Sequence, residues 1–288
     1  MSAETGDLTH VRQFLLRARN ADGGWGYQAG KASRLEPTCW AILALGSMLE
    51  RKVLEQWPCA DGLLLERHSG GPNYAFHGQA LIVLRALNLE HAAGNATLLA
   101  AVQRVKGTGL PASNINRQNN SLQGWSWIDR TFSWVEPTAW CLLALKQWSA
   151  TPGAVGDRTR IVVAEQLLVD RCCAKGGWNY GNANMLGQDL KAFVPTTAVT
   201  LMSLQDRQSL PEVARSVAFL EREATSERSG TALALALMAL RAYGRSTGAV
   251  RDALVAQLPT TLALGKIASA ALSLYALSEA DRYAAVVL

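Results

Sequence analysis

Six segments rich in alanine and leucine recur along the chain, and they constrain its fold more than any other feature. Each is apolar on nearly every side of a helix, as in TALALALMAL, which is typical of a helix surrounded by protein. Spaced by about 35 to 65 residues, they begin near Glu36, Asn73, Glu136, Val194, Ser229 and Gly265. The sequence therefore predicts six buried helices, in which Ala234, Leu237, Ala271 and Leu274 are almost wholly buried.

More amphipathic stretches, charged along one face, separate these segments. They are LTHVRQFLLRARN, VLEQWPCADGLLLERH, NATLLAAVQRVKG, RTRIVVAEQLLVDRCC, PEVARSVAFLEREA and GAVRDALVAQL. Outer and inner helices that alternate in this way can close into a ring of six hairpins around a central cavity. We therefore predict an all-α (α/α)6 toroid in which residues 1–288 form one domain, with no convincing strand pattern. The long segment 107–124 is expected to be either a lid over one mouth or an insertion.

Composition and charge narrow the function classes. The chain is 49% hydrophobic and 18% charged, so much of it must be buried. Its net charge of +5 comes from scattered basic residues with no nucleic-acid motif, so no nucleic-acid partner is expected. The charge favours a phosphate group or peripheral contact with an anionic membrane. The start, MSAETGDLTH, is unlike a signal peptide and no apolar run is long enough to span a bilayer, so a cytoplasmic location is expected.

The five cysteines show no metal-binding spacing. An odd number of cysteines in a cytoplasmic chain favours reduced thiols, and the adjacent Cys172 and Cys173 are interpreted as apolar filler rather than a redox pair. No metal and no cofactor are predicted.

A near copy links two of the helix starts. VEPTAWCLLAL at residues 135–145 resembles LEPTCWAILAL at residues 35–45, one hundred residues earlier. Proline suits the first turn of a helix, so each glutamate is predicted at or near the N-cap with Pro37 or Pro137 at the first helical position. On one interpretation, Glu36 and Glu136 cap their helices and interact with the helix dipoles.

The turns before three inner helices carry a Gly-Trp pair, at Trp25, Trp125 and Trp178. An apolar outer helix, a GGWGY or GGWNYG turn and an inner helix that opens on Pro-Thr resemble the repeat of squalene and oxidosqualene cyclases, class II diterpene cyclases and protein prenyltransferase β subunits. The match is good at residues 14–45, 122–145 and 170–204. The resemblance implies an (α/α)6 toroid with a central pocket and leaves the reaction open.

Acidic residues near the inner-helix starts are the catalytic candidates. Parallel inner helices bring their N-termini to one mouth, so Glu36, Glu136, Asp129 and Asp189 are expected to converge there. The proton donor of class II terpene cyclases lies in an Asp-x-Asp-Asp motif followed by Thr-Ala. Laid against WVEPTA, the central aspartate falls on Glu136, its neighbour on Pro137 and the first on Trp134. The resemblance therefore implies Glu136 as the acid, assisted by Asp129 or Glu36.

Zinc chemistry is an alternative that the same resemblance raises. Protein prenyltransferase β subunits bind zinc through Asp, Cys and His in later repeats, where DLKAFVPTTAV offers Asp189 without a cysteine. A site built from Cys39, Cys141 and His77 is a weaker alternative, because a lone histidine beside apolar neighbours is usually a core residue.

Aromatic residues gather at the same helix starts and are the predicted substrate-binding residues: Trp40, Trp134, Trp140 and Tyr74, with His77 beside them. Aromatic faces stabilise carbocations, and they also fill gaps between bulky helices. With either role, the aromatic side chains would suit a pocket that binds a lipophilic ligand. The sequence thus favours a terpene-cyclase-like enzyme of the isomerase or lyase type acting on an isoprenoid, with a prenyltransferase less favoured. The alternative is a non-catalytic toroid that binds a lipophilic ligand or a partner protein.

Overall fold

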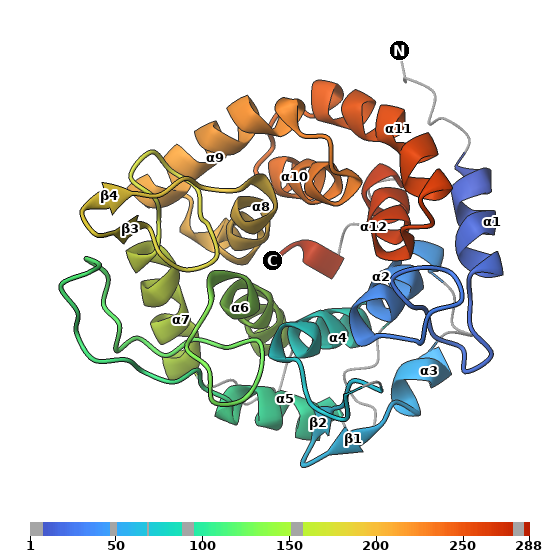
Figure 1. Ribbon diagram of the computed structural model, residues 1–288, viewed down its shortest axis with the longest axis horizontal. Coiled ribbons are helices and arrows are strands. Elements are labelled where there is room, and N and C mark those ends of the chain that lie inside the picture. The colour runs from blue at the N-terminus through green and yellow to red at the C-terminus, as the bar shows by residue number, and fades with distance from the viewer. Residues whose placement is uncertain (1–7, 47–50, 68, 88–94, 151–157, 279–284) are drawn as a thin grey trace.

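The computed structural model describes residues 8–46, 51–67, 69–87, 95–150, 158–278 and 285–288, which form two concentric rings of helices (Figure 1). The inner helices are α2 (Leu35–Leu45), α4 (Tyr74–Ala86), α6 (Val135–Ser149), α8 (Val194–Ser203), α10 (Gly230–Ala242) and α12 (Ile267–Leu277). The outer helices are α1 (Thr9–Arg17), α3 (Arg51–Glu55), α5 (Asn95–Arg104), α7 (Arg158–Asp170), α9 (Pro211–Glu223) and α11 (Gly248–Ala263). The predicted all-α toroid is confirmed.

The inner ring closes because each inner helix packs against the next, and α12 packs against α2. Outer helices cover the remaining sides of the inner ones, which explains why the inner sequences are apolar all round. The four residues predicted to be buried confirm this arrangement, with exposed fractions of 0 to 4% for Ala234, Leu237, Ala271 and Leu274. None of the described helices combines the length and apolar character needed to cross a bilayer.

Two short hairpins depart from the predicted pattern. Antiparallel β1 (Cys59–Ala60) and β2 (Leu63–Leu64) follow α3, and β3 (Asn184–Met185) pairs with β4 (Gln188–Asp189) before α8. The helix predicted over VLEQWPCADGLLLERH is therefore wrong beyond Glu55. Pro58 lacks a backbone N–H, and Asp61 and Gly62 have φ angles of 51° and 80°, which no right-handed helix accommodates.

A repeated pair of hydrogen bonds braces each Gly-Trp turn against its helices. The Trp125 backbone N–H donates to Thr138 Oγ1 at 3.0 Å, and its indole Nε1 donates to the Val102 carbonyl at 2.8 Å. Glycine must precede this tryptophan because a Cβ at Gly124 would lie 2.2 Å from the Thr138 hydroxyl oxygen. The same bonds recur at Trp25 with Thr38 and Leu15, and at Trp178 with Thr197 and Leu168. The motif found in the sequence is thus a structural brace.

Thr138→Val tests this brace. Valine keeps the shape of threonine but leaves the buried Trp125 N–H without its acceptor, so we expect the free energy of unfolding to fall by about 1.5 kcal/mol. Chemical denaturation measures the change, with the exposed Thr260→Val in α11 as the control. Equal effects of the two substitutions would contradict the role given to the threonine.

Candidate active site

The two glutamates of the near copy lie in the first turns of α2 and α6, two positions further into the helix than a glutamate at the N-cap would be. Helix α6 begins at Val135 after the extended Trp134, and the Thr138 N–H donates to the Trp134 carbonyl at 3.2 Å. Glu136 is therefore the second helical residue, and Glu36 has the same place in α2. The glutamates thus lie near the N-cap, as predicted, but the predicted place of Pro37 and Pro137 at the first helical position is wrong. Each proline is the third helical residue, because the helices begin at Leu35 and Val135.

The first amides of the inner helices are satisfied by neighbouring turns instead. The Val135 N–H donates to the Tyr180 carbonyl at 3.1 Å, and the Ile267 N–H donates to the Tyr27 carbonyl at 2.9 Å. At α2 the acceptor is a side chain, since the Leu35 N–H lies 3.4 Å from Glu66 Oε1. These acceptors satisfy the first helical N–H groups, which a capping glutamate would otherwise satisfy.

Glu36 accepts hydrogen bonds from two other elements. The Tyr27 hydroxyl donates to its Oε2 at 2.6 Å, and Gln79 Nε2 on α4 donates to its Oε1 at 3.4 Å. Burial raises the pKa of Glu36, and the two hydrogen bonds oppose that shift because they favour the ionised form. The nearby Glu66 carboxylate adds to the rise, and Arg34 opposes it.

Glu136 interacts electrostatically with Glu36 although one hundred residues separate them in sequence. Burial and then the charge of Glu36 raise the pKa of Glu136 to about 7, against a smaller opposing effect of Trp140. Both side chains remain half-buried rather than fully enclosed. Two carboxyl groups that repel in this way titrate as a pair, and with a pKa of about 7 Glu136 is partly protonated near neutral pH.

The third Gly-Trp repeat has no acid at this position. Thr197 accepts the Trp178 N–H as Thr138 accepts that of Trp125, so the two threonines are equivalent. Counting back from Thr197 places Pro195 where Glu136 stands in α6. The repeats share one brace, whereas the acid is present in the first two and replaced in the third.

Helix α4 brings the elements of the pair together. A Cβ at Gly78 would lie 2.7 Å from the backbone carbonyl carbon of Trp140, so glycine permits close approach of α4 and α6. Its neighbour Gln79 reaches Glu36 on the other side, and α4 also packs against α2. The acid pair thus depends on a close contact between two helix backbones.

An aromatic band lies one helical turn beyond the acids. Trp40 and Trp140 follow Glu36 and Glu136 by four residues and meet edge to face, with ring centroids 5.5 Å apart. Tyr275 on α12 lies 6.2 Å from Trp40. We call Trp40, Trp140 and Tyr275 the aromatic band. Two of the predicted substrate-binding residues, Trp40 and Trp140, are therefore brought together beside the acids.

The other predicted residues make contacts of their own. Asp129 has 73% of its side chain exposed and contacts Arg130 at 3.6 Å, and it contributes to the pKa of neither glutamate. It lies near enough to Tyr74 to raise the pKa of that residue, after burial. Trp134 stacks on Phe132 at 4.7 Å. Asp189 is exposed in β4.

His77 is buried on α4 with Nδ1 2.6 Å from the Asn73 carbonyl, and burial lowers its pKa to about 4. The imidazole is therefore neutral near pH 7. The Cys141 thiol donates to the Tyr74 carbonyl at 3.3 Å, and burial raises the pKa of Cys39. Within the described ranges no three His, Cys, Asp or Glu side chains group as metal ligands would.

Sequence reasoning missed Tyr27, Gln79 and the ion pair of Arg34 Nε with the buried Glu66 Oε2 at 2.6 Å. One signal for Tyr27 was visible, because it stands two residues after the tryptophan in GGWGY, where the second repeat has Trp127. The first repeat thus supplies a hydroxyl to its glutamate, and the second has an indole in the equivalent place.

Comparisons with known proteins agree with this geometry at the level of the fold. No protein-family model and no curated protein matches the chain. Among solved structures, it is similar to the type II terpene cyclase MstE from Scytonema without ligand, with a TM-score of 0.54 at 17% identity over 91% of this chain and 79% of that one. The chain has the fold of type II terpene cyclases. A substituted form of MstE bound to merosterolic acid A, its product, gives a TM-score of 0.54 at 18% identity over 90% of this chain and 80% of that one. Another substituted form, bound to the substrate geranylgeranyl dihydroxybenzoate, gives a TM-score of 0.52 at 17% identity over 90% of this chain and 79% of that one.

The terpene-cyclase fold covers nearly the whole ring, including the three hairpins whose turns show little of the Gly-Trp pattern. Those hairpins keep the alternation of outer and inner helices without the tryptophan brace. Fold similarity therefore extends further along the chain than the sequence motif does.

Proposed function

We propose that this chain, acting as one domain, is an enzyme that protonates an isoprenoid or similarly lipophilic substrate inside the ring and cyclises or isomerises it. Glu136 is the proton donor in this proposal. The observation that carries it is the acid pair: a carboxyl group with a pKa of about 7 stands beside a second carboxylate and one turn from the aromatic band.

The two glutamates have different roles in the proposed reaction. Glu36 accepts two hydrogen bonds and lies near Arg34, and these contacts favour its ionised form. Glu136 has Glu36 as its charged neighbour, so the shared proton resides on Glu136. Glu36 is then a positioning residue that keeps Glu136 protonated near neutral pH.

The chemistry balances within the substrate. Glu136 transfers its proton, a carbocation forms, and loss of a proton from the rearranged cation restores an isomer of the starting material. The aromatic band, whose side chains are at most 2% exposed without substrate, stabilises the positive charge through the ring faces that the bound substrate reaches, each contact by about 0.5 to 2 kcal/mol. Hydrophobic walls exclude water that would otherwise capture the cation.

The strength of the acid limits the choice of substrate. A carboxyl group with a pKa of about 7 is partly protonated near pH 7 and is a weak acid. It transfers a proton to an oxygen, such as that of an epoxide, more readily than to the carbon of an isolated alkene. Epoxidised isoprenoids are therefore favoured by acid strength, and prenylated aromatics are candidates because MstE, which has this fold, binds geranylgeranyl dihydroxybenzoate.

Incubation with a panel of prenyl diphosphates, squalene, epoxidised polyprenes and prenylated aromatics tests the proposal. We expect mass spectrometry and chromatography to find a product of unchanged mass from at least one member. Binding without turnover across the panel would instead support the non-catalytic toroid.

We further propose that the turns around the inner-helix N-termini contact a lipid surface. The β3–β4 hairpin turns through Leu186 and Gly187, whose φ angles of 50° and 78° belong to a type I′ turn. The β1–β2 hairpin fills the equivalent positions with Asp61 and Gly62, the favoured residues. Leucine is disfavoured in this conformation, yet Leu186 is 74% exposed.

Other exposed apolar side chains lie in the neighbouring turns. The Leu186 N–H donates to the Ile115 carbonyl at 2.6 Å, and Tyr180 packs against Phe193 at 5.3 Å. With Phe132 these form an apolar rim of Ile115, Phe132, Tyr180, Leu186 and Phe193, and each is exposed. Arg117 and Lys191 are exposed basic residues in the same turns and suit an anionic bilayer, whereas the exposed Arg130 contacts Asp129.

Leu186→Asn separates this role from folding. Asparagine suits the turn better than leucine, so thermal stability should hold or rise, while binding to anionic phospholipid vesicles should weaken by about tenfold because an inserting side chain is lost. Vesicle sedimentation measures binding, with Val162→Asn, an exposed position in α7, as the control. Undiminished binding by Leu186→Asn would contradict the lipid contact.

A further inference from the structure

Residues 285–288 lie inside the ring of inner helices, although they follow α12 in the chain (Figure 1). Ala285 and Val286 are buried there. They are absent from the repeat pattern of outer and inner helices. Their place in the ring therefore calls for a separate explanation.

Two buried glutamines hold this segment. Gln147 Nε2, in the last turn of α6, lies 2.8 Å from the Ala285 carbonyl and 3.0 Å from the Val287 carbonyl. Gln205 Nε2 donates to the Val286 carbonyl at 2.7 Å, and its Oε1 accepts from the Leu288 N–H at 3.4 Å. All these contacts use backbone groups of residues 285–288.

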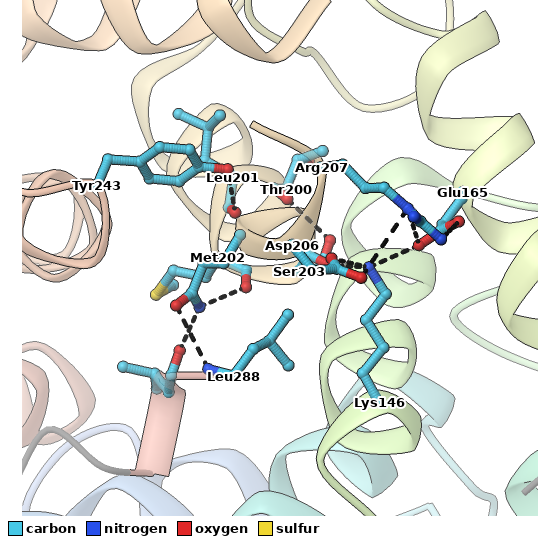
Figure 2. Close-up of polar contacts among 12 residues, drawn as sticks. Lys146, Glu165, Thr200, Leu201, Met202, Ser203, Asp206, Arg207, Tyr243 and Leu288 are labelled. Carbon is cyan, nitrogen blue, oxygen red and sulfur yellow. Dashed lines mark hydrogen bonds and ion pairs between the residues drawn. The ribbon is translucent and has the colours of Figure 1, made fainter. Parts of the chain in front are cut away.

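Ion pairs join the helices that carry the two glutamines. Gln205 opens η2 (Gln205–Arg207), which follows α8. Figure 2 shows Lys146 of α6 between Glu165 of α7 at 2.7 Å and Asp206 of η2 at 2.5 Å. Lys146 also donates to the Ser203 carbonyl at 2.9 Å, at the end of α8. Gln147 and Gln205 are thus the sequence neighbours of Lys146 and Asp206, whose ion pair joins α6 to η2.

This junction lies at the end of the ring opposite the acid pair. Gln147 follows Glu136 by eleven residues along α6, which corresponds to about 16 Å at 1.5 Å per residue. The inner helices run in parallel, so their C-terminal ends lie together at that depth. The segment that the glutamines hold inside the ring therefore lies about 16 Å from Glu136 along the direction of the inner helices.

We propose that residues 285–288 form the floor of the substrate site and set the longest lipophilic chain that it accepts. In this segment the apolar side chains of Val287 and Leu288 have exposed fractions of 40% and 42%. A chain that begins at Glu136 and passes the aromatic band ends against these side chains. The inference rests on the proposed binding of a lipophilic substrate in the ring.

The test uses uncharged prenyl alcohols of increasing length, namely geraniol, farnesol and geranylgeraniol, so that binding is measured without turnover. In the intact protein, calorimetric affinity should rise by roughly tenfold or more with each added isoprene unit while the chain fits, and then stop rising. Val287→Trp keeps the backbone contacts and raises the floor, so the longest alcohol that fits should lose about tenfold in affinity while geraniol keeps its own.

The double substitution Gln147→Ala and Gln205→Ala should act in the opposite direction, because it releases the segment. The limit should move to a longer alcohol, with Gln123→Ala, which loses a glutamine contact to the Gly107 carbonyl, as the control. Circular dichroism checks that each variant is folded, and deletion of residues 285–288 replaces the double variant if that protein unfolds. The same length profile in all folded variants would overturn the floor, whereas failure of every alcohol to bind any protein would overturn the lipophilic site itself.

Discussion

Glu136→Gln lowers turnover by at least about 100-fold in whichever isoprenoid reaction the substrate panel identifies, and leaves ligand affinity nearly unchanged. Glutamine keeps the shape and polarity of the side chain but has no carboxyl proton to transfer. Loss of an interaction made in the transition state lowers kcat and kcat/KM together. Steady-state kinetics and calorimetric binding of an unreactive analogue measure the two quantities.

Glu36→Gln should behave differently, because Glu36 acts through Glu136. Removing its charge removes one of the causes that raise the pKa of Glu136, so the pH at which activity is lost should move from about 7 to a lower value. The maximum rate at low pH should fall much less than in Glu136→Gln. Asp129→Asn serves as the control, since Asp129 is exposed and contributes to the pKa of neither glutamate.

Equal, small effects of Glu36→Gln and Glu136→Gln on turnover would remove Glu136 as the proton donor. An alkaline limb that stays at the same pH in Glu36→Gln, with turnover still lost in Glu136→Gln, would retain the donor and contradict the acid pair. The wild-type profile offers an independent check, because kcat/KM should decline as pH rises through about 7.

The ring could be predicted because its inner helices are surrounded by protein, and burial on all sides leaves an unmistakable apolar pattern. Prediction failed at α3, where Pro58 and the Asp61–Gly62 turn end an apparently amphipathic stretch. The Asp-Gly pair was a hairpin signal, but the two-residue strands beside it are too short to show an alternating pattern.

The site was predictable to the extent that it follows the repeat. Glu36 and Glu136 occupy equivalent helix positions, so a ring with parallel inner helices brings them to the same end. Their partners follow from packing instead. Gln79 reaches Glu36 because Gly78 lets the α4 and α6 backbones approach, and such a contact between distant segments leaves no local pattern.

The choice between cap and acid could not be made from the sequence, because Glu-Pro-Thr at a helix start is compatible with both. The two interpretations predict opposite effects of Glu136 ionisation on the free energy of unfolding. A capping carboxylate favours the folded state when ionised, since it meets the positive end of the helix. A carboxyl group buried beside another carboxylate favours the folded state when protonated. The pH dependence of unfolding therefore discriminates between them without any knowledge of the substrate.

Glu136→Gln should stabilise the protein at pH 8 and have little effect near pH 5. The folded-state pKa of Glu136, about 7, is raised above its ordinary value of 4.5, so its contribution is fully present below the ordinary value and is lost as pH rises through about 7. A shift of this size corresponds to about 3 kcal/mol, and partial exposure to solvent reduces the expected gain to about 2 kcal/mol. Denaturant unfolding of wild type and variant at the two pH values measures the gain. Asp129→Asn, which removes an exposed carboxylate, should show no such difference. A loss of stability in Glu136→Gln at pH 8 would return Glu136 to the role of a helix-stabilising carboxylate, because only a charge that favours folding is missed when it is removed.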